Sequence, residues 1–173
     1  MAPPPLRPYP YTLTHQTRWP DADVYAHVYN GNYYVLADSA INVYLIAHCG
    51  LQPSSTSRDA PIGLMIASSA QFFAPLHFPS RVVTGLCVRK IGTSSVLYEI
   101  GLWEEGKAEL AAVVRATHVF VDRETRVPLG KGGDGRRGLP REMREGLEKI
   151  LVQEEDGEGD GNGNGNAKRD SKL

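Results

Sequence analysis

The side chains best suited to chemistry gather between Arg18 and Tyr33. This segment holds the carboxylates of Asp21 and Asp23 and the imidazole of His27, and it leads directly into a long apolar stretch that predicts a helix. The first N–H groups of a helix have no partner within the helix and lie at the positive end of its dipole. The segment therefore predicts a site in which a carboxylate acts beside donors that stabilise developing negative charge.

Asn30 and Gly31 stand where this helix is expected to begin. The backbone N–H groups of both are candidates to hold an oxygen that gains charge. The side chain of Asn30 is also expected to cap the helix by accepting from its first N–H groups. An ordinary role in the turn suits Asp21 better than catalysis. His27 either takes part in catalysis or orders the loop through bonds to the backbone.

The elements that position this site follow from the apolar pattern. Residues 31–48 are apolar at almost every position and are followed by Gly50, which predicts a helix buried on most sides. Residues 11–19 alternate between apolar and polar side chains, which predicts a first strand, and residues 62–121 are expected to contain four more strands. Residues 140–152 predict an amphipathic helix at the surface. The order favours an α+β fold, with one antiparallel five-stranded sheet wrapped around one buried central helix.

A lone wrapped sheet leaves edges that a second copy of the chain would cover. The sequence therefore predicts a homodimer, with further pairing into a tetramer left open. The two cysteines, Cys49 and Cys87, form no disulfide framework and are expected to be buried or half-buried thiols. The histidines show no metal-ligand spacing, so no metal site is expected.

Composition limits the domain organisation and the class of protein. The 173 residues, 23% charged and 41% hydrophobic, suit one domain over residues 11–152. A proline-rich extension (1–10) precedes it, a glycine-rich insert (130–138) interrupts it, and an acidic Gly/Asn tail (153–173) follows it. Without the last twenty residues the formal charge is +2, which is no nucleic-acid-binding charge. No apolar stretch suits a membrane span or a secretory signal.

The tail ends in Ser171-Lys172-Leu173, the form of a peroxisomal import signal. The preceding glycines and asparagines would hold this tripeptide away from the folded domain. We therefore expect the protein to bind the peroxisomal import receptor and to be located in the peroxisome.

The segment around Asp23 resembles a known family. Its pattern, R-W-x-D-x-D-x-x-x-H-V-x-N-x-x-Y, is similar to the D-x-D-x-x-G-H-V-N-N-x-x-Y signature of hotdog-fold acyl-CoA thioesterases of the 4-hydroxybenzoyl-CoA thioesterase type. The resemblance extends over residues 11–151, and the expected order of strands and helices also matches the hotdog fold. Two departures are Ala26 in place of the common glycine and Tyr29 in place of the first asparagine.

The resemblance implies an acyl-CoA thioesterase with Asp23 as its catalytic carboxylate. Such a carboxylate either attacks the thioester carbonyl, giving an anhydride, or deprotonates water, and both routes stay open. The carbonyl oxygen would be held at Asn30 and Gly31, and neither a metal nor an organic cofactor would be needed. Tyr33 either lines the site or packs in the core.

A second resemblance concerns coenzyme A. The segment Arg89-Lys90-Ile91-Gly92-Thr93-Ser94-Ser95 is similar to a turn that often contacts the nucleotide in this family. Basic side chains at Arg89 and Lys90 suit phosphates, and the hydroxyl and backbone groups of Thr93, Ser94 and Ser95 can donate to them. An ordinary solvated hairpin end is the alternative.

Asp38 lies inside the predicted apolar helix, where an unpaired acid is costly. We expect it to pair with a buried partner such as Arg18, and the alternative is that it faces the site of the second subunit. The acyl group stays open, because the aromatic residues that would shape a pocket suit a core equally: Tyr25, Tyr29, Tyr33, Tyr34, Phe72 and Phe73.

Two other functions stay open beside the thioesterase. A hotdog enoyl-CoA hydratase would carry D-x-N-P-x-H, whereas here Asp23 precedes His27 by four residues without the proline. A non-catalytic module that binds acyl-CoA would show tight binding and no turnover.

Overall fold

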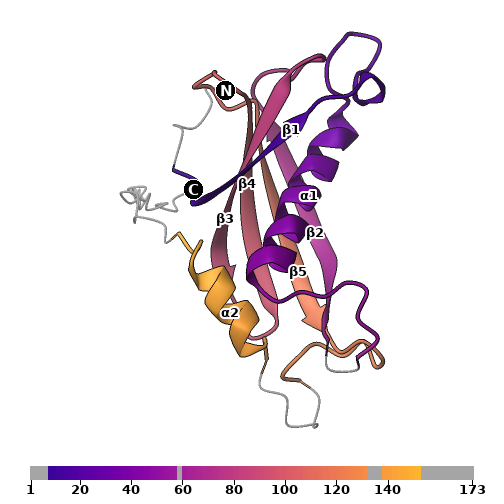
Figure 1. Ribbon diagram of the computed structural model, residues 1–173, viewed down its shortest axis with the longest axis vertical. Helices are drawn as coiled ribbons and strands as arrows, with labels where there is room; N and C mark the ends of the chain where they lie inside the picture. Colours follow the sequence, from indigo (N-terminus) through magenta and orange to yellow (C-terminus); the bar gives the residue numbers. More distant parts are fainter. Residues whose placement is uncertain (1–7, 58–59, 132–137, 153–173) are drawn as a thin grey trace, which may run out of the picture.

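The computed structural model describes residues 8–57, 60–131 and 138–152 and shows one antiparallel sheet with the helix α1 lying across one face (Figure 1). The strand order is β1-β3-β4-β5-β2. The elements are β1 (Tyr11–Gln16), the 3-10 helix η1 (Trp19–Asp21), α1 (Asn30–His48), β2 (Ile62–Phe72), β3 (Arg81–Ile91), β4 (Ser95–Glu104), β5 (Ala112–Val121) and α2 (Arg141–Glu148). The α+β fold with five antiparallel strands is confirmed.

The sheet is built from a run of hairpins. Strands β3, β4 and β5 pair in chain order, β1 adds beside β3, and β2 adds beside β5. The pairing shifts register between Val88 and Lys90 in β3 and between Met65 and Ala67 in β2. Such irregularities increase local twist and bending, so the sheet curves around the helix.

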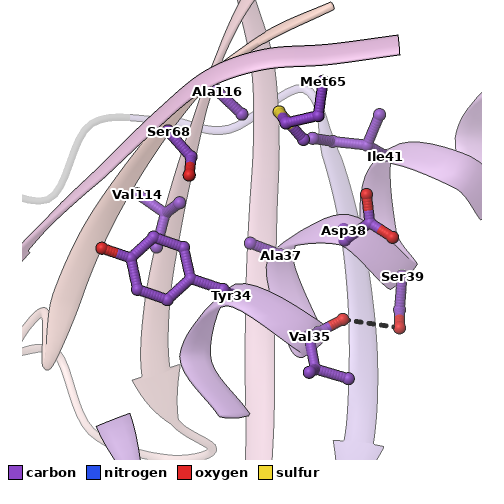
Figure 2. Close-up of a pocket in the computed structure, with 10 residues that line it drawn as sticks. All are labelled: Tyr34, Val35, Ala37, Asp38, Ser39, Ile41, Met65, Ser68, Val114 and Ala116. Atoms are coloured by element: carbon purple, nitrogen blue, oxygen red, sulfur yellow. Dashed lines mark hydrogen bonds between the residues drawn. The ribbon is translucent and has the colours of Figure 1, made fainter. Parts of the chain in front are cut away.

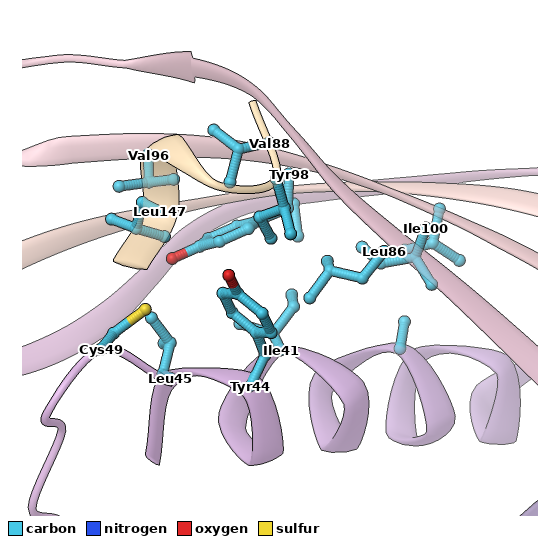
Figure 3. Close-up of a cluster of buried hydrophobic side chains, with 14 of the residues drawn as sticks. Ile41, Tyr44, Leu45, Cys49, Leu86, Val88, Val96, Tyr98, Ile100 and Leu147 are labelled. Carbon is cyan, nitrogen blue, oxygen red and sulfur yellow. The ribbon is translucent and has the colours of Figure 1, made fainter. Parts of the chain in front are cut away.

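The core lies between α1 and the inner face of the sheet. Figure 3 shows Ile41, Tyr44 and Leu45 of α1 facing side chains that alternate along the middle strands, with Leu147 of α2 closing one end. The inward residues of β4 are Val96, Tyr98, Ile100 and Leu102, all fully buried. The hydroxyl of Tyr44 donates to the carbonyl oxygen of Gly146 at 2.7 Å and ties α1 to α2.

Within the protomer, however, α1 is buried along one side only. Val35, Val43 and Ile46 are 55%, 41% and 50% exposed. The helix is apolar around most of its circumference, whereas a single sheet covers one side of it. The neighbouring edge strand β2 is similarly open, with Ile66 62% exposed. The sequence predicts that α1 is buried on most sides, but one protomer buries only one side of this helix.

Several predicted boundaries differ in detail. β1 ends at Gln16 rather than at residue 19, because Thr17 turns away and its N–H and hydroxyl both donate to the carbonyl of Ser80. The closing helix ends at Glu148, and Leu151 pairs instead with Val88 in a short parallel bridge. Leu151 therefore does not belong to the buried face of α2.

The outer face of the sheet is partly covered by the end of the proline-rich segment. The ring of Tyr9 stacks on Trp103 at 6.0 Å between centroids. A Cβ added at Gly85 or Gly101 would lie 2.5–2.6 Å from atoms of Tyr9, so both positions require glycine for this contact. Residues 1–7 of this extension, most of the glycine-rich insert and the tail from 153 lie outside the described residues.

Both cysteines are buried thiols that form no disulfide, as predicted. Burial is the main cause that raises the pKa of the Cys49 thiol to about 12. Among the helices described, none is long and apolar enough to cross a membrane.

Candidate functional site

The loop between β1 and α1 is anchored by Asp21. Its carboxylate accepts from the guanidinium of Arg18 at 2.9 Å and from the Arg18 backbone N–H at 2.7 Å. The side-chain hydrogen bond from Arg18 is the main cause that lowers the pKa of Asp21. The carbonyl of Asp21 accepts from the N–H of Tyr29 at 2.8 Å and from the amide of Asn32 at 3.0 Å. The predicted turn role of Asp21 is confirmed.

Asp23 is held in place by the backbone that follows it. One carboxylate oxygen, Oδ1, accepts from the N–H of Tyr25 at 2.8 Å and from the N–H of His27 at 3.1 Å. The N–H of Asp23 in turn donates to the carbonyl of His27 at 2.8 Å. None of the described residues donates to Oδ2. The carboxylate is thus oriented through one oxygen and presents the other for chemistry.

Ala26 makes the tight turn that allows these bonds. Its φ is +59°, in the left-handed region, and its N–H donates to the carbonyl of Asp23 at 3.1 Å. A residue with a Cβ pays roughly 1–2 kcal/mol for this conformation. The glycine common in the related signature would adopt it without that cost.

The start of α1 differs from the prediction in its cap. Asn30 is already the first helical residue, Tyr29 occupies the N-cap, and no side chain caps the helix. The expected capping by Asn30 is therefore wrong, because its backbone is helical rather than extended. The N–H groups of Asn30 and Gly31 remain at the open end of the helix. The ring of Tyr29 lies over Gly31, where an added Cβ would be 2.7 Å from it.

Tyr33 belongs to the core beneath this helix end. It is 2% exposed, its hydroxyl accepts from the N–H of Leu76 at 3.0 Å, and its ring packs on Phe72. Burial is the main cause that raises its pKa, and the negative charges of Glu104 and Asp23 add to the effect. Of the two roles left open for Tyr33, the structure shows packing.

His27 packs against a second histidine that the sequence did not single out. The rings of His27 and His77 meet edge to face with centroids 5.4 Å apart. His77 is bound in turn by the carboxylate of Glu104 at 2.8 Å. The only sequence signal was the position of Glu104 at the end of a strand whose alternate residues are apolar.

Two hollows lie near these elements. One, of about 580 Å³, is lined by Asp23 and by mainly apolar neighbours: Trp19, Pro20, Ala22, Val24, Ala26 and Phe78. The other, of about 370 Å³, lies between α1 and the strands β2 and β5, and Figure 2 shows the Asp38 and Tyr34 side chains beside it.

Asp38 is exposed and lines this second hollow. The predicted pairing with Arg18 is wrong, because Arg18 is bound by Asp21 and Asp38 lies on the open side of the helix. An acid is tolerated inside the apolar stretch of α1 because the protomer leaves this side of α1 uncovered.

The predicted coenzyme A turn joins β3 to β4. The Arg89 side chain is 6% exposed and lies 3.9 Å from the Glu99 carboxylate, whereas Lys90 is exposed. Ser94 is buried, the N–H of Gly92 donates to the carbonyl of Ser95 at 2.7 Å, and the carbonyl of Thr93 accepts from the segment leading into α2.

This turn and the Asp23 loop lie at opposite ends of the sheet within one protomer. β3 begins beside the segment that contacts the Asp23 loop and runs for 11 residues before the turn, about 35 Å. The structure thus brings together Asp23, His27, Asn30, Gly31 and Tyr33 but not the predicted coenzyme A residues.

Comparison with known proteins decides the family. The sequence matches the Thioesterase superfamily over residues 25–111, which include the Asp23 loop's second half, α1, β2, β3 and β4. The chain belongs to this superfamily. A search of curated proteins found no match. Thioester hydrolysis is therefore the class of reaction of this protein.

Solved structures agree with this assignment. The thioesterase is 39% identical to the PA5185 protein of Pseudomonas aeruginosa, with a TM-score of 0.74 over 83% of this chain and 92% of that one. A 1,4-dihydroxy-2-naphthoyl-CoA thioesterase from Synechocystis shares the fold at 20% identity and a TM-score of 0.67, covering 79% and 94% of the two chains. BH1999 gentisyl-coenzyme A thioesterase does so at 20% and 0.62, covering 80% and 99%.

The strain at Ala26 gives a first prediction. Ala26→Gly should raise the free energy of unfolding by about 0.5–1 kcal/mol, because glycine adopts φ +59° without the steric cost. Ala22→Gly is the matched control: its φ is −90°, so glycine there should lower stability by a similar amount. Urea unfolding followed by circular dichroism measures both. A loss of stability in Ala26→Gly would contradict the assigned strain.

Proposed function

We propose that this thioesterase hydrolyses an acyl-CoA to the free acid and coenzyme A, with Asp23 as the catalytic carboxylate. One observation carries the proposal: Asp23 is fixed through Oδ1 by two backbone N–H groups, while Oδ2 accepts from none of the described residues. A rigid carboxylate with one open oxygen beside a helix start suits attack on a carbonyl. Membership of the superfamily implies hydrolysis of a thioester. The proposal adds that this thioester is an acyl-CoA.

Asp23 has two routes to the same products. As a nucleophile it attacks the carbonyl carbon, the C–S bond breaks, and water then opens the resulting anhydride. As a general base it takes a proton from the water that attacks directly. In both routes charge develops on the carbonyl oxygen, and the N–H groups of Asn30 and Gly31 would stabilise it.

We place the acyl group of the substrate in the apolar hollow beside Asp23. Trp19, Val24 and Phe78 form part of the wall of this hollow, and Asp23 itself also lines it. Two proteins of the same fold are named as thioesterases of 1,4-dihydroxy-2-naphthoyl-CoA and gentisyl-coenzyme A. These names support a coenzyme A ester as the substrate class here.

A homodimer would complete this site. Pairing two β2 strands antiparallel covers the open edge of the sheet, and it also covers the apolar side of α1 that includes Val43 and Ile46. The antiparallel arrangement brings the partner's turn at 92–95 to the end of the sheet where Asp23 lies. The predicted coenzyme A residues Arg89 and Lys90 would thereby serve the neighbouring subunit.

The role of Asp23 predicts the effect of removing its charge. Asp23→Asn keeps the acceptor for Tyr25 and His27 and should lower kcat on acyl-CoAs by about 10³-fold. A panel of acyl-CoAs assayed with a thiol-reporting dye measures this. Asp122→Asn is the matched control, since Asp122 also accepts from two backbone N–H groups in a turn but lies beyond β5.

Full activity in Asp23→Asn would remove Asp23 from the mechanism. Tight binding by the wild type with no turnover of any acyl-CoA would instead identify a binding module, and hydration of an enoyl-CoA without thiol release would identify a hydratase.

The proposed interface predicts a linked loss of assembly and activity. Ile66→Lys places a charge on the open edge strand β2, so it should dissociate the dimer and lower kcat/KM at least about tenfold. Leu151→Lys, an exposed apolar position beside β3, should leave both unchanged. Analytical ultracentrifugation and the acyl-CoA assay measure the two effects. A monomeric wild type with full activity would overturn the proposed interface.

We also propose import into the peroxisome through the tripeptide Ser171-Lys172-Leu173. A fluorescent protein fused before residue 1 should give a punctate peroxisomal pattern. Removal of the three residues should make it diffuse, because the receptor then has no address to bind. Puncta that persist after the deletion would refute the signal.

A further inference from the structure

Glu104 and His77 form a hydrogen-bonded pair beside the Asp23 loop. Oε1 of Glu104 accepts from the backbone N–H of His77 at 3.1 Å and lies 2.8 Å from its Nδ1. The other carboxylate oxygen contacts the ammonium of Lys107. With Nδ1–H directed at a carboxylate, Nε2 of His77 is left as the basic nitrogen of the neutral ring.

The position of Glu104 is unusual for a carboxylate at a strand end. Alternation along β4 places it on the same face as Leu102, toward the helix, whereas Trp103 packs on Tyr9 at the outer face. Its side chain is only 11% exposed. Desolvation alone would raise the pKa of Glu104. Hydrogen bonds and charges from Lys107 and His77 outweigh this effect and hold the pKa of Glu104 below its usual value.

The pair reaches the site through His27. The rings of His77 and His27 meet edge to face at 5.4 Å, and the two backbones form a short antiparallel bridge. The N–H of His27 is one of the two donors that hold Asp23. The hydroxyl of Tyr33 accepts from the N–H of Leu76, the residue before His77, so this buried ring also lies beside the pair.

We propose that Glu104 and His77 are positioning residues of a proton relay that acts through His27 in the hydrolysis proposed above. In this proposal His27 takes a proton from the reacting water. The His77 ring packed on it, held by Glu104, orients the His27 ring, and the Glu104 carboxylate stabilises the positive charge that His27 acquires. The inference rests on the proposed function, takes its nucleophilic route, and adds to it a proton acceptor for the water that opens the anhydride.

The relay balances the reaction in the nucleophilic route of Asp23. Asp23 attacks the acyl carbon and the carbon–sulfur bond breaks, which releases the thiolate of coenzyme A. Water then attacks the acyl carbon of the anhydride, the carbon–oxygen bond to Asp23 breaks, and one water proton passes to a ring nitrogen of His27. That proton then goes to the thiolate of coenzyme A. The second water proton stays on the acid product, which releases it to solvent.

Several charged or titratable groups surround His77 and bear on the pH profile of kcat predicted below. Glu104 at the end of β4 and Lys107 in the following turn lie on one side, and His27 and Asp23 lie on the other. Tyr33 of α1 lies beneath them. A neighbouring carboxylate that does not face His77 is Glu105, which pairs with Arg81 at 3.1 Å.

The test compares Glu104→Gln with Glu105→Gln. Glutamine at 104 keeps an acceptor for His77 but removes the charge, so the acid limb of the kcat–pH profile should move about one unit lower. The plateau of kcat should fall about tenfold, because the ring becomes a weaker base, while KM stays within about twofold. Glu105→Gln removes a carboxylate from the same turn and should match the wild type.

His77→Asn gives an independent variant at a half-exposed position. It should remove one ionisation from the acid limb, whereas a merely structural role would lower thermal stability and leave the shape of the profile unchanged. Profiles of Glu104→Gln and His77→Asn that overlay the wild-type shape would overturn the relay.

A second measurement separates the relay from the proposed function. The NMR titration of the His27 ring should change in Glu104→Gln and in His77→Asn but not in Glu105→Gln. An unchanged titration in the first two variants overturns the relay, even in a protein that hydrolyses acyl-CoAs. A wild type inactive on every acyl-CoA would instead overturn the proposed function.

Discussion

The arrangement of the site depends on how Asp21 joins the loop to the helix. Its carboxylate is bound by Arg18 at the end of the first strand segment, and its carbonyl is bound by Tyr29 and Asn32 at the start of α1. A single residue thus ties the chain before and after the turn. Asp23, two residues later, can be held by short backbone bonds because the path around it is already determined.

The second constraint is that the apolar surface of α1 is larger than the surface that the sheet of one protomer covers. α1 is apolar over more of its surface than one curved sheet can bury, and the strand β2 beside it presents an open edge. The same side of α1 holds Asp38 and the smaller hollow. The Asp23 loop and the turn at 92–95 lie at opposite ends of the sheet, so a protomer alone separates the two segments that we propose bind one extended substrate.

The apolar pattern was sufficient to predict the five strands, the long helix and the closing helix. Asp23 became a candidate through the resemblance of a local motif, and both backbone donors to its carboxylate lie within four residues of it. Local patterns failed where a partner comes from a distant segment. The sequence offers two acids as partners for Arg18, namely Asp21 and Asp38. Only the fold shows that Asp21 lies next to Arg18 and that Asp38 lies on the open side of α1. His77 and Glu104 are 27 residues apart and share no motif, so only the fold reveals the pair.

The state of the two thiols has a consequence for the chemistry. Cys49 and Cys87 are both buried, and burial keeps the Cys49 thiol protonated at neutral pH. The proposed site relies instead on carboxylate, imidazole and backbone N–H groups, none of which is a thiol that peroxides oxidise readily. A hydrolase built in this way offers an oxidant no accessible thiol, so its reaction tolerates surroundings in which a cysteine nucleophile would be lost.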